Sequence, residues 1–197
     1  MSKATDDLQP ASEVVAVSQP ILETGRLVLR PFRAGDAAMV QELAGDRRVA
    51  EMTSNVPHPY EDGMAEHWIA TLGAGYAEGA QATFAITRRD DDMLVGAVGL
   101  RIDRSSREAE LGYWTGAPFW NRGYATEAAK ALLGFGFREL ALTAITAAHL
   151  ARNPASGRVM QKAGMRREGT VRRSTRTAGE YEDLIAYRIR REDWLGE

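Results

Sequence analysis

The chain has 197 residues, a formal net charge of -2 and no cysteine. This length predicts one domain with a core that needs neither metal nor disulfide, and the balanced charge does not favour a nucleic-acid partner. The lack of cysteine excludes disulfide scaffolds, thiolate metal sites and a catalytic thiol that would carry an acyl group.

The first residues are expected to form a flexible tail. Their only apolar run, residues 14–17, is too short for the core of a signal peptide. No segment of the sequence approaches the length of a membrane span. We therefore expect a cytoplasmic protein, without a membrane partner, that has a tail over residues 1–19 and a single domain over residues 20–197.

Hydrophobic periodicity predicts one strand, two helices and three strands in the first half of the domain. Asp36 is the expected N-cap of the first helix, and Gly73 and Gly75 are expected to weaken the second. The elements are expected over residues 21–32 (strand), 34–52 and 61–80 (helices), and 81–89, 93–103 and 108–115 (strands).

A helix, a buried strand, a short helix and a hairpin are predicted in the second half, over residues 123–140, 142–151, 153–164, 165–173 and 181–190. The short helix has the clearest ends, with Asn153 as N-cap, Pro154 at the first helical position and Gly164 just past the end. The resulting order is β α α β β β α β α β β. This mixture favours an α+β sheet covered by helices over a doubly wound α/β fold.

The loop before the helix at 123–140 places Gly116, Pro118 and Gly123 between an aromatic strand and an alanine-rich helix. Residues 122–126 are expected to form the first helical turn, whose N–H groups lack partners within the helix. Gly123 would allow an anion to approach the backbone closely. Taken alone, this pattern is better explained by an ordinary turn, with Glu127 interacting with the helix dipole.

Other common site patterns are absent from the sequence. It contains neither a P-loop, nor a dinucleotide-binding fingerprint, nor a Gly-x-Ser-x-Gly elbow. His58, His67 and His149 lack the spacing of metal ligands, so each is expected to be a surface or packing residue and no metal site is predicted.

The order of elements, together with FWNRGYATEA at 119–128 and NPASGRVMQKAGMRREG at 153–169, resembles the GNAT superfamily of acetyl-coenzyme A dependent N-acetyltransferases. The resemblance is closer to its RimJ/RimL-type branch and covers about residues 21–194. It implies direct transfer of an acetyl group from acetyl-CoA to a primary amine through a ternary complex. The acceptor would be a protein N-terminal α-amine or a small-molecule amine, and a homodimer is possible. The alternative is a non-catalytic module that binds acyl-CoA.

The resemblance also implies which residues hold acetyl-CoA. The family's phosphate-binding pattern falls on residues 120–125, with Trp120 in place of the first polar residue. The strand before it is expected to part from its neighbour and to offer backbone groups to the pantetheine arm. The implied cofactor-binding residues are Trp114, Thr115, Arg122, Gly123, Tyr124, Ala125, Thr126, Asn153 and Ser156.

Asn153 and Ser156 match the family's Asn-x-x-Ser pair. The resemblance implies that Asn153 contacts the pantetheine and that the Ser156 hydroxyl lies near the thioester sulfur. A helix N-cap explains Asn153 without any ligand, and a local hydrogen bond explains Ser156 in the same way. Both interpretations remain open for each residue.

Glu110 is the leading candidate for the base that takes the proton of the amine, because it lies on the strand that precedes the loop. A solvated carboxylate beside Arg107 is an equally good interpretation. The alternative bases are Glu180, Glu182 and Asp183. An α-amine with a pKa of about 7.7 to 8.0 is roughly one-tenth neutral at pH 7, so such an acceptor needs only a weak base.

Aromatic residues near the first two helices and in the last hairpin are candidates for the acceptor pocket, namely Tyr60, Trp68 and Tyr181. Each is more typical of a core residue than of a pocket. Arginines at positions 166, 167, 172, 173 and 176 could attract an acidic acceptor or the ribose phosphate of coenzyme A, although charged hairpin residues are usually solvated.

Overall fold

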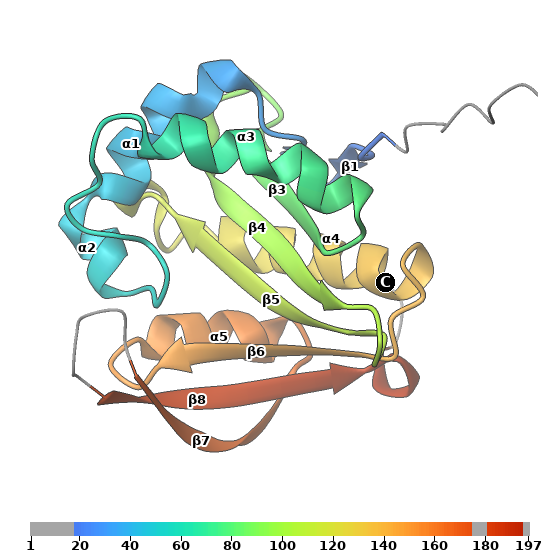
Figure 1. The fold of residues 1–197 in the computed structure, drawn as a ribbon. Coiled ribbons are helices and arrows are strands. Elements are labelled where there is room, and N and C mark those ends of the chain that lie inside the picture. Colours follow the sequence, from blue (N-terminus) through green and yellow to red (C-terminus); the bar gives the residue numbers. More distant parts are fainter. Residues whose placement is uncertain (1–17, 175–180, 195–197) are drawn as a thin grey trace, which may run out of the picture.

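The computed structural model describes residues 18–174 and 181–194, which form one mixed sheet with helices on both faces (Figure 1). The strands are β1 (Leu22–Glu23), β2 (Leu27–Arg30), β3 (Gln81–Arg88), β4 (Leu94–Asp103), β5 (Glu108–Thr115), β6 (Ala144–Leu150), β7 (Arg166–Ser174) and β8 (Tyr181–Arg190). Their order is β1-β2-β3-β4-β5-β6-β8-β7, and of the described pairs only β5–β6 is parallel. The predicted α+β class is confirmed.

The helices within the described ranges are α1 (Ala37–Gly45), α2 (Arg47–Glu51), α3 (Met64–Ala77), α4 (Tyr124–Arg138) and α5 (Pro154–Lys162). Helices α1 to α3 lie on one face of the sheet, and α4 and α5 lie on the other (Figure 1). Side chains alternate along a strand, so neighbouring residues enter different cores. Phe84 packs in the larger cluster with α4, whereas Ala85 packs in the smaller cluster with α1 and α3.

The first predicted strand and the first predicted helix are each broken in two. A turn at residues 24–26 separates β1 from β2, and the Thr24 hydroxyl closes it by accepting a hydrogen bond from the Leu27 N–H at 2.9 Å. Helix α1 ends at Gly45, and Asp46 caps α2 by accepting from the Arg48 N–H at 2.9 Å. The predicted order therefore lacks one short strand and one short helix.

Helix α3 is continuous over Met64–Ala77, so Gly73 and Gly75, where weakening was predicted, do not interrupt it. A Cβ at Gly75 would lie 2.4 Å from the Gln81 side-chain nitrogen. Glycine at this position lets β3 begin close to α3, because no side chain separates the two.

Asp36 occupies the predicted N-cap position of α1, but its side chain has a different role. It makes no side-chain cap to α1. Its carboxylate instead accepts two hydrogen bonds from the buried Arg30 guanidinium, at 2.8 and 2.9 Å, and one from the Arg33 N–H at 2.8 Å. Burial would raise the pKa of Asp36, but these donors outweigh it and hold the pKa below its ordinary value.

The Asp36→Asn variant is expected to lose about 3 kcal/mol of unfolding free energy at neutral pH, since the buried Arg30 would keep only the exposed Asp92, at 3.3 Å, as a counter-charge. The depressed pKa contributes stability above the unfolded value of about 3.9, and this stability is lost as pH falls through the folded pKa. Urea titrations at several pH values should therefore show that the difference in unfolding free energy between the parent protein and Asp36→Asn becomes smaller below about pH 4. Asp62→Asn, at an exposed carboxylate bonded to Gln41, is the control and should unfold like the parent protein.

The predicted N-terminal tail lies mostly outside the described residues, so it stays a prediction. Gln19, at its expected end, already contacts the sheet, because its side-chain amide donates to the Thr83 carbonyl at 2.8 Å. The single domain over residues 20–197 likewise stays a prediction.

Candidate active site

Strands β5 and β6 part in the middle of the sheet. They pair only from Glu108 to Glu110, opposite Ala144 to Thr146, and the Thr146 hydroxyl donates to the Ala109 carbonyl at 3.2 Å near the point of parting. Beyond this point β5 continues to pair only with β4, and β6 only with β8. The facing edges of the two strands therefore leave backbone groups for a ligand.

A cleft of about 340 Å³ opens where the strands part. Its walls come from β5, β6, β8 and α5, and residues 52–56, which follow α2, cover one side. On β5, Leu111 and Tyr113 point toward the cluster around α4, whereas Trp114 points toward α1 and α3. Because side chains alternate, Glu110 projects to the same face as Trp114. The cleft thus has a carboxylate on the α1–α3 face and Tyr113 on the α4–α5 face.

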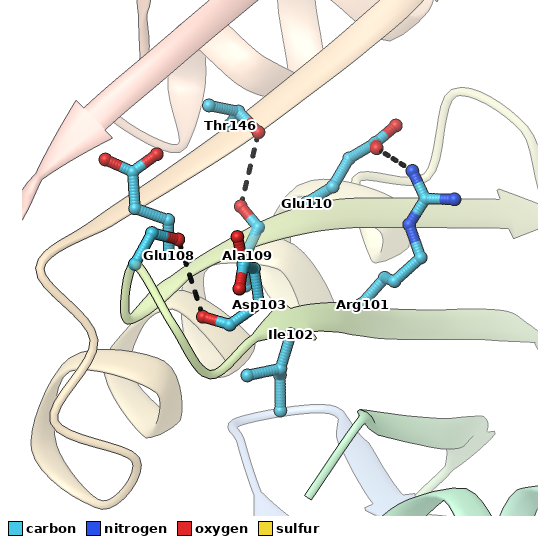
Figure 2. A pocket seen from close by; sticks show the side chains of 8 residues that line it. Arg101, Ile102, Asp103, Glu108, Ala109, Glu110 and Thr146 are labelled. Carbon is cyan, nitrogen blue, oxygen red and sulfur yellow. Dashed lines mark hydrogen bonds and ion pairs between the residues drawn. The ribbon is translucent and has the colours of Figure 1, made fainter.

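Glu110 lies at the α1–α3 side of this cleft and forms an ion pair with Arg101 of β4 (Figure 2). The two residues are opposite each other in the β4–β5 register. The partner is therefore Arg101 and not the sequence neighbour Arg107. The Arg101 side chain is 73% exposed, so it can turn into solvent and leave the carboxylate to a substrate.

Glu182 of β8 also lines the cleft and pairs with Arg152. The same guanidinium donates to the Glu51 carbonyl at 2.8 and 3.0 Å, so it joins α2, the β6–α5 connection and β8. The Arg152–Glu182 pair therefore holds these three segments together. Of the other alternative bases, Asp183 is exposed and does not line the cleft, and Glu180 lies outside the described residues.

Tyr113 and Ser156 meet on the opposite side of the cleft. The Tyr113 hydroxyl lies 2.9 Å from the Ser156 hydroxyl and 2.9 Å from the Ser156 carbonyl oxygen. Next to them, Gly157 of α5 packs against His149 of β6, where a Cβ would lie 2.6 Å from Nε2. Sequence reasoning missed Tyr113. Because side chains alternate along a strand, its position next to Trp114 could have placed it on the opposite face of the sheet.

The loop between β5 and α4 ends in a left-handed glycine, since Gly123 has a φ of 79° and is the N-cap of α4. The Glu127 N–H donates back to the Gly123 carbonyl at 3.1 Å. The preceding amides, those of Tyr124, Ala125 and Thr126, have no helical carbonyl ahead of them to bind. Arg122, predicted within the first turn, lies just before the cap. The helix start thus presents a cluster of donors that suits an anion.

The first hairpin holds this loop in place. The Glu127 carboxylate accepts from the Thr24 hydroxyl at 2.7 Å, the Arg26 N–H at 2.8 Å and the Arg26 Nε at 2.7 Å. Arg26 also donates to the Arg122 carbonyl at 2.9 Å. Burial would raise the pKa of Glu127, but the bonds from Thr24 and Arg26 keep it below its ordinary value.

Trp120 supports the same loop from the side of β5. Its indole N–H donates to the Thr115 carbonyl at 2.8 Å, and Thr115 itself is buried. The Thr115 carbonyl is therefore already used within the protein. This contact explains why tryptophan fits the first position of the phosphate-binding pattern, where the side chain has a bracing role.

Asn153 is confirmed as the N-cap of α5, because its side-chain oxygen accepts from the Ser156 N–H at 3.2 Å. Its amide nitrogen donates to the Met52 carbonyl at 2.9 Å. Each end of the amide thus has a protein partner and keeps capacity for one further hydrogen bond. The residue fixes both Ser156 and the segment that covers the cleft.

The predicted acceptor residues Tyr60 and Trp68 are packed elsewhere. Both belong to the smaller core, where the ring of Trp68 meets that of Phe32 edge-on with centroids 4.9 Å apart. Neither lines the cleft, where residues 52–56 occupy the expected place. Tyr181 belongs to β8, but its side chain lies outside the described residues.

The structure describes only some side chains of the predicted arginine group. Arg166 lies 3.6 Å from Asp193, so its charge has an acidic neighbour. The side chains of Arg172 and Arg173, and the whole of Arg176, lie outside the part of the chain that the structure describes.

A second hollow, of about 460 Å³, adjoins the cleft on the α1–α3 face (Figure 2). It shares Arg101 and Glu110 with the cleft and extends toward the β4–β5 turn, where Asp103 and Glu108 lie. It is an open depression remote from the α4 start. The smaller, more enclosed cleft is therefore the better candidate for chemistry.

Two further properties bear on the class of protein. No group of three or more His, Asp or Glu residues among those described could hold a metal ion. No helix in the same residues is long and apolar enough to cross a membrane.

Residues 26–166 match the family described as the acetyltransferase (GNAT) domain. The chain therefore belongs to the GNAT family of acetyltransferases. The relative named Uncharacterized N-acetyltransferase YnaD, from Bacillus subtilis (strain 168), is 32% identical over 173 residues, which cover 88% of this chain and 98% of the relative.

Solved structures support the same assignment. A GNAT-family acetyltransferase from Bacillus anthracis has a TM-score of 0.77 and 28% identity, covering 88% of this chain and 99% of that one. RimL, a ribosomal L7/L12 α-N-protein acetyltransferase solved with coenzyme A, has a TM-score of 0.78, and the match covers 87% of this chain and 98% of that one. Its sequence identity is 16%, so this likeness shows the shared fold alone. The protein is thus an acetyl-CoA-dependent N-acetyltransferase of the RimJ/RimL type.

Proposed function

We propose that this enzyme transfers an acetyl group directly to an N-terminal α-amine held on the α1–α3 face of the cleft. The observation that carries the proposal is the juxtaposition of the donor-rich start of α4, the parted strands, and a cleft with Glu110 on one side and Ser156 on the other. Each feature suits one part of a ternary complex of acetyl-CoA and an amine.

The residues present fit acetyl-CoA. The amides of Tyr124, Ala125 and Thr126, with the left-handed Gly123 and the amide of Arg122 before them, suit a pyrophosphate. The part of β5 that no longer pairs with β6, near Trp114 and Thr115, suits the amides of the pantetheine arm through groups other than the Thr115 carbonyl. Asn153 keeps capacity for one further hydrogen bond to the same arm. When bound, acetyl-CoA would supply the thioester carbonyl that the amine attacks.

The protein's own groups divide the proton chemistry between the two faces of the sheet. Glu110 takes the proton of the amine, directly or through water, because its partner Arg101 can move into solvent. Ser156 lies at the first turn of α5, where its hydroxyl and the helix start both favour negative charge on the sulfur. Glu182 is the second candidate base.

An α-amine is favoured over a lysine side chain on protonation grounds. At pH 7 roughly one-tenth of an α-amine is neutral, against less than about one-thousandth of a lysine amine, so a single partly exposed carboxylate is sufficient for the former. The hollow beyond Arg101 leaves room for the chain that follows the amine. A small-molecule amine remains the alternative acceptor.

The test is transfer of labelled acetyl from acetyl-CoA to a panel of N-terminal peptides, lysine peptides and small amines. Because the chain has no cysteine, a thiol reagent would report released coenzyme A without background from the protein. We expect peptides with a free α-amine to be acetylated fastest. Coenzyme A binding without transfer to any acceptor would instead support a non-catalytic acyl-CoA-binding module. A homodimer and a cytoplasmic location stay predictions.

A further inference from the structure

Gly112 is an exposed glycine inside β5, a strand with neighbours on both sides in the sheet. Glycine weakens the interior of a strand, because it loses more conformational freedom on folding than other residues and has no side chain to pack. A glycine at such a position therefore needs a reason, which can be the backbone conformation, the packing or the close approach of a ligand.

Neither the backbone conformation nor the packing requires glycine at position 112. The φ of Gly112 lies outside the left-handed region, so residues other than glycine can adopt it. An added Cβ would have no described atom within 4 Å. Two glycines of β4 differ in this respect. A Cβ at Gly96 would lie 2.2 Å from the Trp114 carbonyl oxygen, and one at Gly99 would lie 2.7 Å from the Thr83 hydroxyl oxygen. Packing thus explains the glycines of β4 but not Gly112.

The open space over Gly112 belongs to the cleft. Gly112 lines the cleft together with Glu110, Trp114 and residues 52–56. Because side chains alternate along β5, Gly112 faces α1–α3, as Glu110 and Trp114 do. Ser156 and the start of α4 are on the other face of the sheet (Figure 1). The cofactor is expected on that side, so the space over Gly112 is left for the acceptor.

The segment that covers this space, residues 52–56, is held at both ends. At its start, the Met52 carbonyl accepts a hydrogen bond from the Asn153 side-chain amide at 2.9 Å. At its end, Val56 packs against the smaller core. Because the cover is fixed, a side chain at position 112 would narrow the space instead of pushing the cover aside.

We propose that Gly112 is a specificity-determining residue: the space over it receives the side chain of the acceptor's first residue. This inference rests on the proposed function, which is transfer to an N-terminal α-amine. The strands part beyond Glu110, so the amine whose proton this carboxylate takes lies on the Gly112 side. Two residues span about 7 Å along a strand, so the carbon next to the amine lies over Gly112. The enzyme therefore accepts α-amines whose carbon carries a side chain, and not only an N-terminal glycine.

The test fills the space in two steps, with Gly112→Ala and Gly112→Val. The acceptors are three peptides that differ only in their first residue, which is glycine, alanine or leucine. The parent enzyme should acetylate the leucine peptide as well as the glycine peptide. In Gly112→Val the ratio of kcat/KM for the leucine peptide to that for the glycine peptide should fall about tenfold or more, because methyl-sized changes in a pocket alter discrimination by about 10- to 200-fold. Gly112→Ala should give a smaller fall.

Gly169→Val is the matched control. Gly169 is also a strand glycine, in β7, with a φ outside the left-handed region and no described atom within 4 Å of an added Cβ, but it does not line the cleft. This variant should treat the three peptides as the parent enzyme does. Urea titrations should show Gly112→Val to be at least as stable as the parent, since valine favours strands. Calorimetry should show its affinity for coenzyme A unchanged.

The inference is wrong if the ratio stays the same in Gly112→Val, or if the parent enzyme already rejects the leucine peptide. An equal loss for all three peptides, or a loss of coenzyme A affinity, would also overturn it, because the space would then belong to the cofactor. If the parent binds coenzyme A but acetylates none of the peptides, the proposed function itself fails and the inference with it. The two failures are therefore distinguishable.

Discussion

Replacing Gly123 with valine is expected to weaken coenzyme A binding by about a hundredfold or more. Gly123 has a φ of 79°, which a β-branched residue rarely adopts, so the chain would shift just before α4. The shift would misdirect the amides of Tyr124 and Ala125. Hydrogen bonds to charged groups contribute about 1.5 to 3 kcal/mol each, so losing two of them accounts for this factor. Calorimetry with coenzyme A measures it.

Gly63→Val is the matched control for backbone strain. Gly63 is also a left-handed N-cap, with a φ of 82°, but it begins α3, where no atom would contact an added Cβ within 4 Å. The two variants should therefore lose similar stability in urea titrations, while only Gly123→Val loses coenzyme A. If both bind like the parent protein, the start of α4 is not the phosphate site.

Glu110→Gln is expected to lower kcat on the order of a hundredfold with coenzyme A binding unchanged, because general-base catalysis typically contributes that much or more. The glutamine oxygen can still accept from Arg101, so the local structure should survive. The variant would depend on acceptor that is already neutral in solution. Its rate should therefore rise more steeply with pH than that of the parent enzyme, up to the pKa of the α-amine near 7.7 to 8.0.

Glu182→Gln separates the two carboxylates that line the cleft. Because Glu182 shares Arg152 with the Glu51 carbonyl, we expect this substitution to lower stability more than turnover. Rate measurements with one N-terminal peptide and urea titrations of both variants would check the assignment. A rate loss confined to Glu182→Gln would identify Glu182 of β8, and not Glu110, as the general base.

Local pattern alone predicted most of the sheet and the ends of α5. Alternation between apolar and polar side chains reports which face of a strand is buried, and Asn153, Pro154 and Gly164 each act on neighbouring backbone groups. The same reasoning identified the loop at Gly123. It missed the break at Asp46, because a continuous helical pattern hides a cap that forms only when the chain turns.

What the sequence by itself determined, then, is the set of elements, their buried faces and the donor-rich turn before α4. Only the tertiary structure decided which side chains meet: Tyr113 with Ser156, Arg26 with Glu127, Glu110 with Arg101, and Trp68 with Phe32 beside the smaller core. Periodicity records whether a position is buried. It carries no information on which distant segment covers that position, and the parting of β5 from β6, which creates the cleft, depends on all the strands and helices packed around it.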